Sequence, residues 1–365
     1  MNMQASLKNK RVLLGLSGGV DSAVAAALLK ENGYEVIARY VKGYAPPGVS
    51  CPEERDIADA RAVALQLGID FRVINEGSEA YHDNVYRPFI SQYFAGKTPN
   101  PDIRCNRLVK FPFLAKAAEE LGIQFIATGH YFRRVEDRFF MAKDGIKDQS
   151  YFLYAVPRNL LLNCLFPIGN FTKAEVRSMA EKINLSVAKK KSTRGVCMVG
   201  DLSLPEAIEN EAENMSRVLA PARVVLLKED GEEENLGVVA GSIFLASTIG
   251  QRNGFGISYR FPIYVVRKDI SSNTLFFKVM PEGEKSFLVS NLNFVSPEVP
   301  EFPLRCFAKI RTPGKLQNCL VKKNGGDLLT VTLENPDSGI APGQSAVFYS
   351  DRNDSKELLG GGIIN

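Results

Sequence analysis

The eight residues 15–22, "GLSGGVDS", constrain the fold of this chain more than any other stretch. They lie between an apolar segment, "RVLLGLS", and an Ala/Leu-rich segment, "DSAVAAALLKENGY". A glycine-rich turn between a strand and a helix is typical of phosphate binding, because backbone N–H groups and the helix N-terminus meet the anion there. The lysine that follows the glycines of kinase-type P-loops is missing. The stretch therefore predicts a strand–turn–helix unit with a different kind of anion site.

Apolar and amphipathic segments alternate through the first 200 residues, which predicts strands alternating with helices. Thr172 and Glu175 have the spacing of a capping box at the start of the last of these helices. Such alternation predicts an α/β fold with a doubly wound parallel sheet over residues 1–200. We expect strands over 10–16, 34–41, 70–76 and 124–131, and helices over 21–32, 52–69, 110–123 and 171–185.

The pattern changes after residue 200. Residues 201–217 are acidic and helical in pattern, and strand-rich sequence with Gly and Pro punctuation follows from about residue 220. In "LRCFAKIR" (304–311), apolar residues alternate with Arg305, Phe307, Lys309 and Arg311, which predicts a strand with one apolar and one largely basic face. We expect a small β-rich central domain over 201–290 and a C-terminal β-barrel over 291–365.

Bulk composition sets the class of protein. A chain of 365 residues with 45% hydrophobic content is large enough for two or three domains, and its net charge of +4 permits a nucleic-acid partner without requiring one. No apolar run reaches the eighteen or so residues that span a bilayer, and the start lacks a signal-peptide core, so we expect a cytoplasmic protein with no membrane partner. Its six cysteines form no C-x-x-C pair and there are only two histidines, which argues against a zinc or iron–sulfur site.

The glycine-rich stretch also carries side chains that indicate its ligand. Ser17 and Ser22 can donate hydroxyl hydrogen bonds to phosphate, whereas Asp21 would repel phosphate unless Mg²⁺ lay between them. That combination favours a nucleoside triphosphate with Mg²⁺, held through its departing pyrophosphate. A plain strand–helix turn is the alternative. The complete S-G-G-x-D-S pattern resembles the PP-loop ATP pyrophosphatases, which cleave ATP between its α and β phosphates and leave AMP on a substrate oxygen.

Two cysteines lie in polar, basic surroundings. In "GKTPNPDIRCNRLVKF" (96–111), prolines on both sides of Asn100 predict a stiff loop without regular structure, which presents Asp102 and Cys105 among basic residues. In "AKKKSTRGVCMVGD" (188–201), three lysines and an arginine precede Cys197. Positive charge lowers the pKa of a thiol and enlarges its thiolate fraction.

A buried, inert thiol is the simpler reading of either cysteine alone. On an adenylating domain, two such thiols favour sulfur transfer, in which one carries a persulfide and the other attacks it or closes a disulfide with it. Cys51, Cys164, Cys306 and Cys319 are expected to have no chemistry.

Eight sequence blocks then occur in a fixed order: "GLSGGVDS", "TPNPDIRCNRLVKF", "ATGHY", "KDQSYFLY", "RGVCMVGD", "TIGQR", "APGQSAVFY" and "LGGGII". In these blocks, from about residue 10 to the C-terminus, the chain resembles the tRNA-specific 2-thiouridylases. Those enzymes replace O2 of the wobble uridine of certain tRNAs with sulfur. The resemblance implies ATP with Mg²⁺, a tRNA partner, and a protein that donates persulfide sulfur, either a cysteine desulfurase or a relay carrier.

The resemblance also implies residue roles. Asp102 would act as general acid or base beside the target base, Cys105 as the nucleophile, and Cys197 as the persulfide carrier. For His130, which the block "ATGHY" also offers as a catalytic residue, we expect a supporting hydrogen-bonding role. The implied ATP-binding residues are Gly15, Leu16, Ser17, Gly18, Gly19, Val20, Asp21, Ser22, Val41 and Gly129, and the implied tRNA-binding residues are Asn100, Pro101, Lys147, Asp148, Gln149, Arg311 and Thr312.

Some positions depart from the family pattern. The four residues Ser192–Gly195 replace Asp-Ser-Thr-Gly before the second cysteine, Gly241 and Ser247 replace a histidine and a tyrosine, and Thr312 replaces a tyrosine. Without the resemblance, residues 147–149 read as a solvated turn and Arg311 as a plain surface residue.

Two other functions fit part of the pattern. One is a different adenylating enzyme on the same scaffold, such as an amidating ligase or another tRNA thiolase. Ligases do not need the two thiols, and cluster-dependent thiolases need C-x-x-C pairs. The other is an inert RNA-binding protein that kept the fold, which intact Ser17, Asp21, Asp102, Cys105 and Cys197 disfavour.

Overall fold

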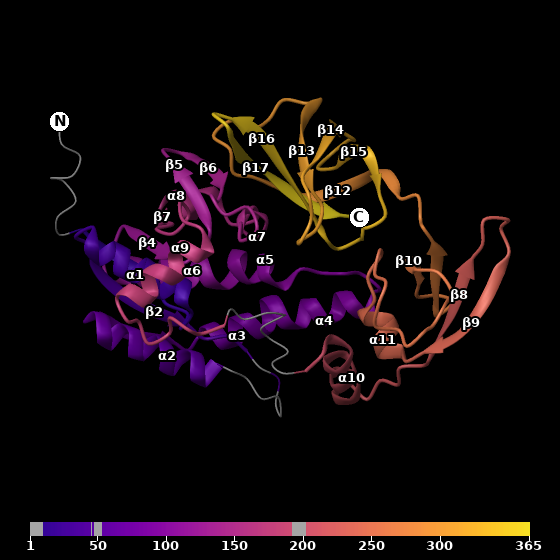
Figure 1. Cartoon of the computed structure of the whole chain (residues 1–365), viewed down its shortest axis with the longest axis horizontal. Helices are drawn as coiled ribbons and strands as arrows, with labels where there is room; N and C mark the ends of the chain where they lie inside the picture. The colour runs from indigo at the N-terminus through magenta and orange to yellow at the C-terminus, as the bar shows by residue number, and fades with distance from the viewer. Residues whose placement is uncertain (1–9, 45, 47–52, 192–201) are drawn as a thin grey trace.

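The structure, a computed structural model of the chain, describes residues 10–44, 46, 53–191 and 202–365. Cys51, Ser192–Gly195 and Cys197 lie outside the described residues. The N-terminal α/β part and a small sheet lie at opposite ends of the long axis, and the C-terminal barrel packs beside the α/β part (Figure 1).

The N-terminal part is built on a parallel five-stranded sheet in the order β3-β2-β1-β4-β7. The order reverses at β1, because β2 follows on one side of it and β4 on the other. Ligands of such sheets bind at the carboxyl ends of the strands at this reversal. The strands are β1 (Arg11–Gly15), β2 (Glu35–Val41), β3 (Asp70–Ile74), β4 (Phe125–Thr128) and β7 (Cys164–Leu165).

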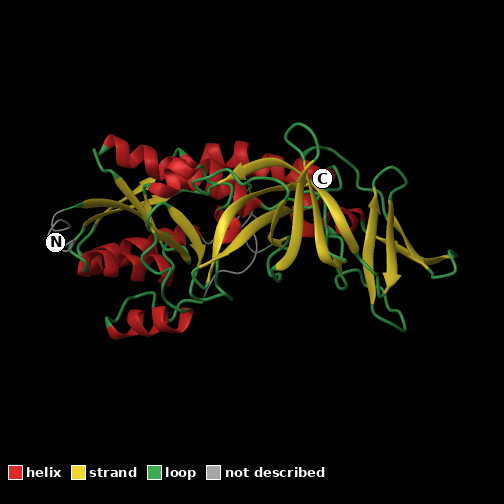
Figure 2. Cartoon of the chain, turned by 90° about the horizontal axis from the view of Figure 1, so that it is seen from above, coloured by secondary structure: helices red, strands yellow, loops and turns green. Residues whose placement is uncertain are grey.

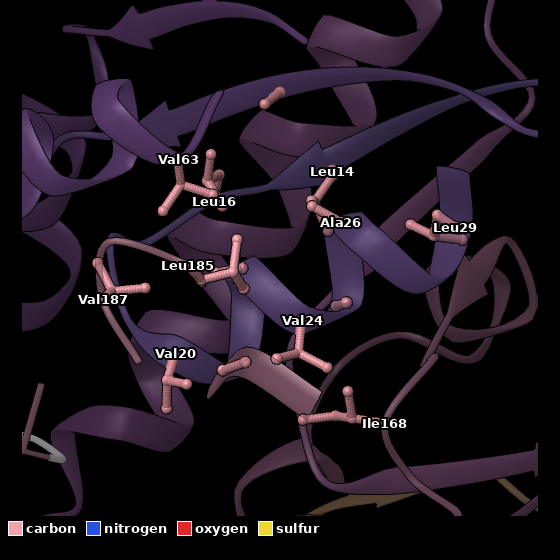
Figure 3. Close-up of a cluster of buried hydrophobic side chains, with 14 of the residues drawn as sticks. Leu14, Leu16, Val20, Val24, Ala26, Leu29, Val63, Ile168, Leu185 and Val187 are labelled. Carbon is pink, nitrogen blue, oxygen red and sulfur yellow. The ribbon is translucent and has the colours of Figure 1, made fainter. Parts of the chain in front are cut away.

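Helices cover both faces of this sheet, which confirms the predicted doubly wound fold. Leu14 and Leu16 pack against α1 (Val20–Glu31), α2 (Glu53–Leu67) and α9 (Lys173–Lys182) on one face (Figure 3). Leu13, which precedes Leu14 on β1, points to the other face and shares a core with α6 (Phe111–Glu120). In Figure 2, helices lie on both sides of the strands at this end of the molecule. Side chains of a strand alternate between faces, so a strand buried on both sides is apolar throughout. The predicted capping box of Thr172 and Glu175 is present at the start of α9.

A run of helices leads from the sheet towards the central domain. α4 carries aromatic residues that share one hydrophobic core with the central sheet, so the two parts are packed together. This core contains Phe89 and Tyr93 of α4, together with Val265 and Phe277 of the central sheet. The remaining helices are α3 (Gly77–Tyr81), η2 (His82–Tyr86), α4 (Arg87–Phe94), α5 (Pro101–Cys105), η3 (Asn106–Lys110), α7 (Ser150–Leu153), α8 (Arg158–Leu162), α10 (Leu204–Asn214) and α11 (Gly241–Ala246).

The central and C-terminal sheets are the β-rich parts that the sequence predicts. The central sheet has the order β10-β11-β8-β9. In the C-terminal part, six strands close into a barrel through the pairing of β12 with β17. The strands are β8 (Ala222–Leu227), β9 (Glu233–Val239), β10 (Ile263–Asp269), β11 (Thr274–Val279), β12 (Glu284–Phe294), β13 (Leu304–Lys309), β14 (Gln317–Lys323), β15 (Leu329–Asp337), β16 (Ser345–Arg352) and β17 (Ser355–Ile364).

A hairpin from the N-terminal part extends the barrel sheet. The hairpin consists of β5 (Phe132–Val135) and β6 (Arg138–Met141), and β6 pairs with β17 (Figure 1). Arg138 forms a 2.8 Å ion pair with the buried Glu357 of β17. Nearby, the hydroxyls of Ser150 and Tyr349 lie 2.9 Å apart, and the Tyr151 hydroxyl donates to the Ser345 carbonyl. Buried polar contacts therefore join the barrel to the parallel-sheet domain.

Two expectations about local structure are wrong. The stretch 96–111 is not a loop throughout, because α5 begins at Pro101 and leads through η3 into α6. Proline is tolerated at the first helical position, where its missing N–H has no partner within the helix, and Asn100 caps the helix by accepting from the N–H groups of Asp102 and Ile103. The second error concerns Lys309, which lies on the predicted basic face of its strand but is buried and interacts electrostatically with Asp148.

Within the described part of the chain, every helix is too short or too polar to cross a bilayer.

Candidate functional site

A cavity of about 490 Å³ opens where the strand order reverses, at the carboxyl ends of β1 and β4. Residues predicted from five distant stretches meet around it, which the sequence could not show. The predicted residues that line it are Gly15, Leu16, Ser17, Gly19, Val20, Asp21, Ser22, Val41, Cys105, Gly129, Lys147 and Gln149.

The loop before α1 is shaped to receive an anion. Gly19 is the N-cap of α1 and, among the described residues, no side chain caps this helix end. The Ser22 hydroxyl instead accepts from the Ser17 N–H at 3.2 Å and donates to the Gly19 carbonyl at 3.1 Å. The loop is therefore held by its own serines, while the helix N-terminus faces the cavity with its positive dipole end.

Gly18 is confined between this loop and α2. Its φ is +73°, and a Cβ atom built on it would lie 2.1 Å from the Asp56 carbonyl oxygen. Lys190 fixes the same contact from the other side, because its Nζ donates to the Gly18 carbonyl at 3.0 Å and pairs with Asp56 and Asp59 at 2.7 and 2.5 Å. Only glycine fits this position without moving the backbone.

Gly129 allows a second close approach. A Cβ atom on it would lie 2.6 Å from the Ser22 backbone nitrogen, so β4 comes directly against the start of α1. The next residue, His130, stacks on Phe111 at 5.9 Å and hydrogen-bonds the Thr128 hydroxyl at 2.9 Å. Burial and the nearby Lys110 lower the pKa of His130 to about 3, so its ring is neutral at physiological pH. This supports a hydrogen-bonding role and disfavours a cationic one.

Asp21 is held by two residues that sequence reasoning missed. Its Oδ1 atom accepts from Lys173 Nζ at 2.6 Å and from the Tyr131 hydroxyl at 2.9 Å. Burial and Asp21 together raise the pKa of Tyr131, which stays protonated, and burial lowers the pKa of Lys173 despite the pairing with Asp21. The predicted capping box at Thr172 was the one available signal, since it places Lys173 at a helix start.

Asp102 and Cys105 lie three residues apart on α5, so they project from neighbouring positions on one side of the helix. Cys105 is 1% exposed and lines the cavity. Asp102 is half-buried, and burial raises the pKa of its carboxyl above the ordinary value, while the Lys110 ammonium opposes part of the rise. A carboxyl with a raised pKa is suited to proton transfer near neutral pH.

The raised pKa of Asp102 predicts a pH-dependent change in stability. A folded-state pKa above the unfolded value contributes stability that is fully present below the unfolded pKa, about 3.9, and is lost as pH rises through the folded pKa. Asp102→Asn should therefore unfold at a higher temperature than wild type at pH 8, and the difference should disappear towards pH 3.5. Thermal unfolding at the two pH values measures this, and a variant that is less stable at pH 8 would contradict the effect of burial.

The predicted tRNA-binding residues are dispersed. Lys147 is exposed, whereas Asp148 is buried and accepts hydrogen bonds from the Ala142 N–H and the Ser150 hydroxyl. Gln149 accepts from the Tyr131 N–H. The structure thus gives Asp148 a role in fixing the backbone of this turn, in place of a solvated position. Asn100 caps α5, Pro101 is buried beneath it, and Arg311 and Thr312 are half-buried on the barrel, with Arg311 paired to Asp337 at 3.2 Å.

The described residues on each side of the stretch that contains Cys197 share a cavity or a hydrophobic core with Cys105. On one side, Lys190 and Lys191 line the same cavity as Cys105. On the other side, Ala207 and Ile208 of α10 share a hydrophobic core with Cys105.

The other cysteines that the structure describes, Cys164, Cys306 and Cys319, belong to hydrophobic cores. Cys164 is buried, and burial raises the pKa of its thiol. Cys306 and Cys319 are opposite each other on β13 and β14, with their sulfur atoms 3.5 Å apart inside the barrel, and their contact raises the pKa of Cys306. In the residues that the structure describes, no group of three or more His, Cys, Asp or Glu side chains could hold a metal ion. Asp21 alone could still supply one carboxylate to Mg²⁺, which takes its remaining ligands from phosphates and water.

Comparison with known proteins identifies the family. The family described as "tRNA methyl transferase HUP domain" matches residues 10–201, "tRNA methyl transferase PRC-barrel domain" matches 218–278, and "Aminomethyltransferase beta-barrel domain" matches 284–364. The tRNA-specific 2-thiouridylase MnmA of Proteus mirabilis (strain HI4320) is 39% identical over 371 residues, which cover 97% of each chain. The MnmA of Marinomonas sp. (strain MWYL1) is 37% identical over 380 residues, 100% of this chain and 93% of that one. The chain belongs to the tRNA-specific 2-thiouridylase family.

Membership of the 2-thiouridylase family confirms the resemblance seen in the sequence blocks, and the three matched regions follow the parallel-sheet, central and barrel parts of the fold. Among solved structures, the U34-tRNA thiolase NcsA from Methanococcus maripaludis with its [4Fe-4S] cluster aligns with 59% of this chain and 69% of its own, at 19% identity and a TM-score of 0.38. A likeness this low carries no argument about the present site.

Proposed function

We propose that this protein is an ATP-dependent tRNA-uridine 2-sulfurtransferase that thiolates the wobble uridine of tRNA anticodons. The observation that carries the proposal is that the Cys105 thiol and the nucleotide loop Gly15–Ser22 line one cavity. An enzyme that activates an oxygen with AMP and then replaces it with sulfur needs these two groups at the same place. The family to which the chain belongs supports the same reaction.

The nucleotide would bind with its phosphates on the loop. The uncapped N-terminus of α1 and the hydroxyl of Ser17 are suited to phosphate oxygens, and Ser22 would hold the loop in shape through its own hydrogen bonds. Val41 and Gly129 form the cavity wall assigned to adenosine. Asp21 would hold the Mg²⁺ that accompanies ATP. When bound, Mg²⁺ would supply positive charge that offsets the negative charge of the phosphates. In this arrangement O2 of the uridine becomes adenylated and pyrophosphate leaves.

Sulfur transfer would follow on the side of the cavity formed by α5. The base is flipped out of its stack to reach the cavity. The terminal sulfur of a Cys197 persulfide bonds to C2, and AMP leaves with O2. The Cys105 thiolate then attacks the Cys197 sulfur, which breaks the bond to the transferred sulfur, leaves that sulfur on C2 and forms a Cys105–Cys197 disulfide. Asp102 would act as the general acid or base that donates protons to the target base or removes them from it. The disulfide must then be reduced for the next turnover, and a persulfide donor protein must reload Cys197.

Binding of tRNA would involve both the cavity rim and the barrel. Lys147 and Gln149 line the cavity, Asn100 and Pro101 hold the start of α5 near the base, and Arg311 and Thr312 lie on the barrel. We infer that Asp148 acts through the backbone of its turn, because its carboxylate is buried. We also expect the enzyme to work in the cytoplasm, where thiols are kept reduced.

The test measures chemistry and product together. Purified protein is incubated with ATP, Mg²⁺, unmodified tRNA and a persulfide source, pyrophosphate release is followed, and anticodon nucleosides are analysed by mass spectrometry. We expect pyrophosphate release that requires tRNA and a 16-Da increase at the wobble uridine, the mass difference between sulfur and oxygen. Release without added tRNA would indicate another adenylating enzyme, and tRNA binding without any release would indicate an inert RNA-binding protein.

A further inference from the structure

Lys173 is the first residue of α9, and its side chain reaches the nucleotide loop from 152 positions away in the sequence. The capping box formed by Thr172 and Glu175 fixes the start of the helix, and the Lys173 N–H donates to Asp144 at 2.9 Å. From this fixed backbone the Lys173 side chain, 13% exposed, lines the cavity and places Nζ 2.6 Å from Asp21. The ammonium group is therefore both anchored and inside the site.

The loop needs a positive charge that it does not contain. Kinase-type P-loops carry a lysine directly after their glycines, whereas this loop carries Asp21 instead. A carboxylate in a loop that binds a polyanion is unfavourable unless a cation balances it. Lys173 supplies that balance.

The neighbouring Lys190 is poorly suited to the same task. Its ammonium contacts Asp56, Asp59 and the Gly18 carbonyl, so two carboxylates of α2 compensate its single charge and hold it against them. Lys173 has one carboxylate partner, and that partner already accepts a hydrogen bond from the Tyr131 hydroxyl. If Nζ moved from Asp21 to a phosphate, the Asp21 carboxylate would keep a donor.

We propose that Lys173 is the cationic ligand of the pyrophosphate portion of the nucleotide. It replaces the lysine that the loop lacks, and Asp21 orients its ammonium until phosphate oxygens bind at the helix N-terminus. This assignment rests on the proposed use of the cavity for ATP. It adds a specific residue and a specific ligand group, the β and γ phosphates that leave as pyrophosphate.

The test is a binding measurement that needs neither tRNA nor turnover. Isothermal titration calorimetry compares inorganic pyrophosphate and AMP as ligands of wild type, Lys173→Met and Lys143→Met. Lys143 is the matched control, because it forms a 3.0 Å ion pair with Glu175 of the same helix but does not line the cavity. We expect Lys173→Met to weaken pyrophosphate binding on the order of 10- to 100-fold, the range for a hydrogen bond to a charged group, and AMP binding less than about threefold. Lys143→Met should bind both ligands as wild type does.

Equal losses for pyrophosphate and AMP would show a merely structural role, and unchanged pyrophosphate binding would also overturn the assignment. A second variant covers the case in which Lys173→Met does not fold. Asp21→Asn removes the competing carboxylate, so in EDTA, without metal, it should bind pyrophosphate several-fold more tightly than wild type. No gain there would contradict the proposal. The binding measurement contains no tRNA, so it tests the role of Lys173 even if the protein fails to thiolate tRNA. Such a failure would count against the proposed function alone.

Discussion

Replacing Cys197 with serine is expected to abolish tRNA thiolation while tRNA-dependent release of pyrophosphate continues. The serine hydroxyl cannot carry a persulfide, so the base is still adenylated but no sulfur is available to replace its activated oxygen. We expect thiolation to fall by roughly a thousandfold or more, the scale seen when a nucleophilic group is removed. Mass spectrometry of anticodon nucleosides and a pyrophosphate assay on the same samples separate the two steps.

The control for this variant is Cys319→Ala, since Cys319 lies inside the barrel and contacts Cys306. It should leave both steps intact. Cys105→Ser gives the complementary result, because without the second thiol the transferred sulfur stays bonded to Cys197, and a covalent adduct of tRNA with the protein should accumulate. Thiolation at the wild-type rate by the Cys197 variant would remove the persulfide role from this residue.

Gly18→Ala is expected to abolish nucleotide-dependent activity by displacing the loop. The new Cβ would lie 2.1 Å from the Asp56 carbonyl oxygen, and the φ of +73° is itself unfavourable for alanine. The backbone must move by about an ångström or more, and misplacement on that scale can cost about a hundredfold in rate, so we expect at least that loss of pyrophosphate release. The affinity for ATP, measured by calorimetry, should fall with it.

Gly122→Ala is the control that separates the effect of a positive φ from the effect of the close contact with Asp56. Gly122 has a similar φ of +63°, but nothing lies within 4 Å of a Cβ built there. This variant should lose a small amount of thermal stability, on the order of 1 kcal/mol, and keep full activity. If Gly18→Ala were as active as Gly122→Ala, the tight contact between the loop and α2 would not matter to the site.

Local pattern was sufficient to predict the parallel-sheet domain and the β-rich parts. Residues such as Leu13 and Leu14 are buried on opposite faces, so an unbroken apolar run correctly indicated an interior strand. Thr172 and Glu175 form a cap with each other, and a cap is a property of a few neighbouring residues. The error at 96–111 was also local. Two prolines suggested a loop, but Pro101 occupies the first helical position, where proline is tolerated.

The missing parts of the site depend on contacts across the chain. Lys173 and Tyr131 contact Asp21 across 152 and 110 positions of the sequence. Periodic sequence patterns indicate local structure and carry no information about such distant contacts. Asp148 and Lys309 look like surface residues in the sequence, and they are buried because two domains close over them. Cys105 was found through its basic neighbours, whereas its position in the nucleotide cavity was visible only after folding.

The hairpin β5–β6, which adds to the barrel sheet next to β17, has a mechanical consequence. A barrel joined by a flexible tether could swing, but this one shares a hydrogen-bonded sheet and a buried ion pair with the domain that houses the cavity. The distance between an RNA segment bound to the barrel and the cavity would then be fixed. Selection of the one nucleotide at the correct distance would follow from the architecture itself.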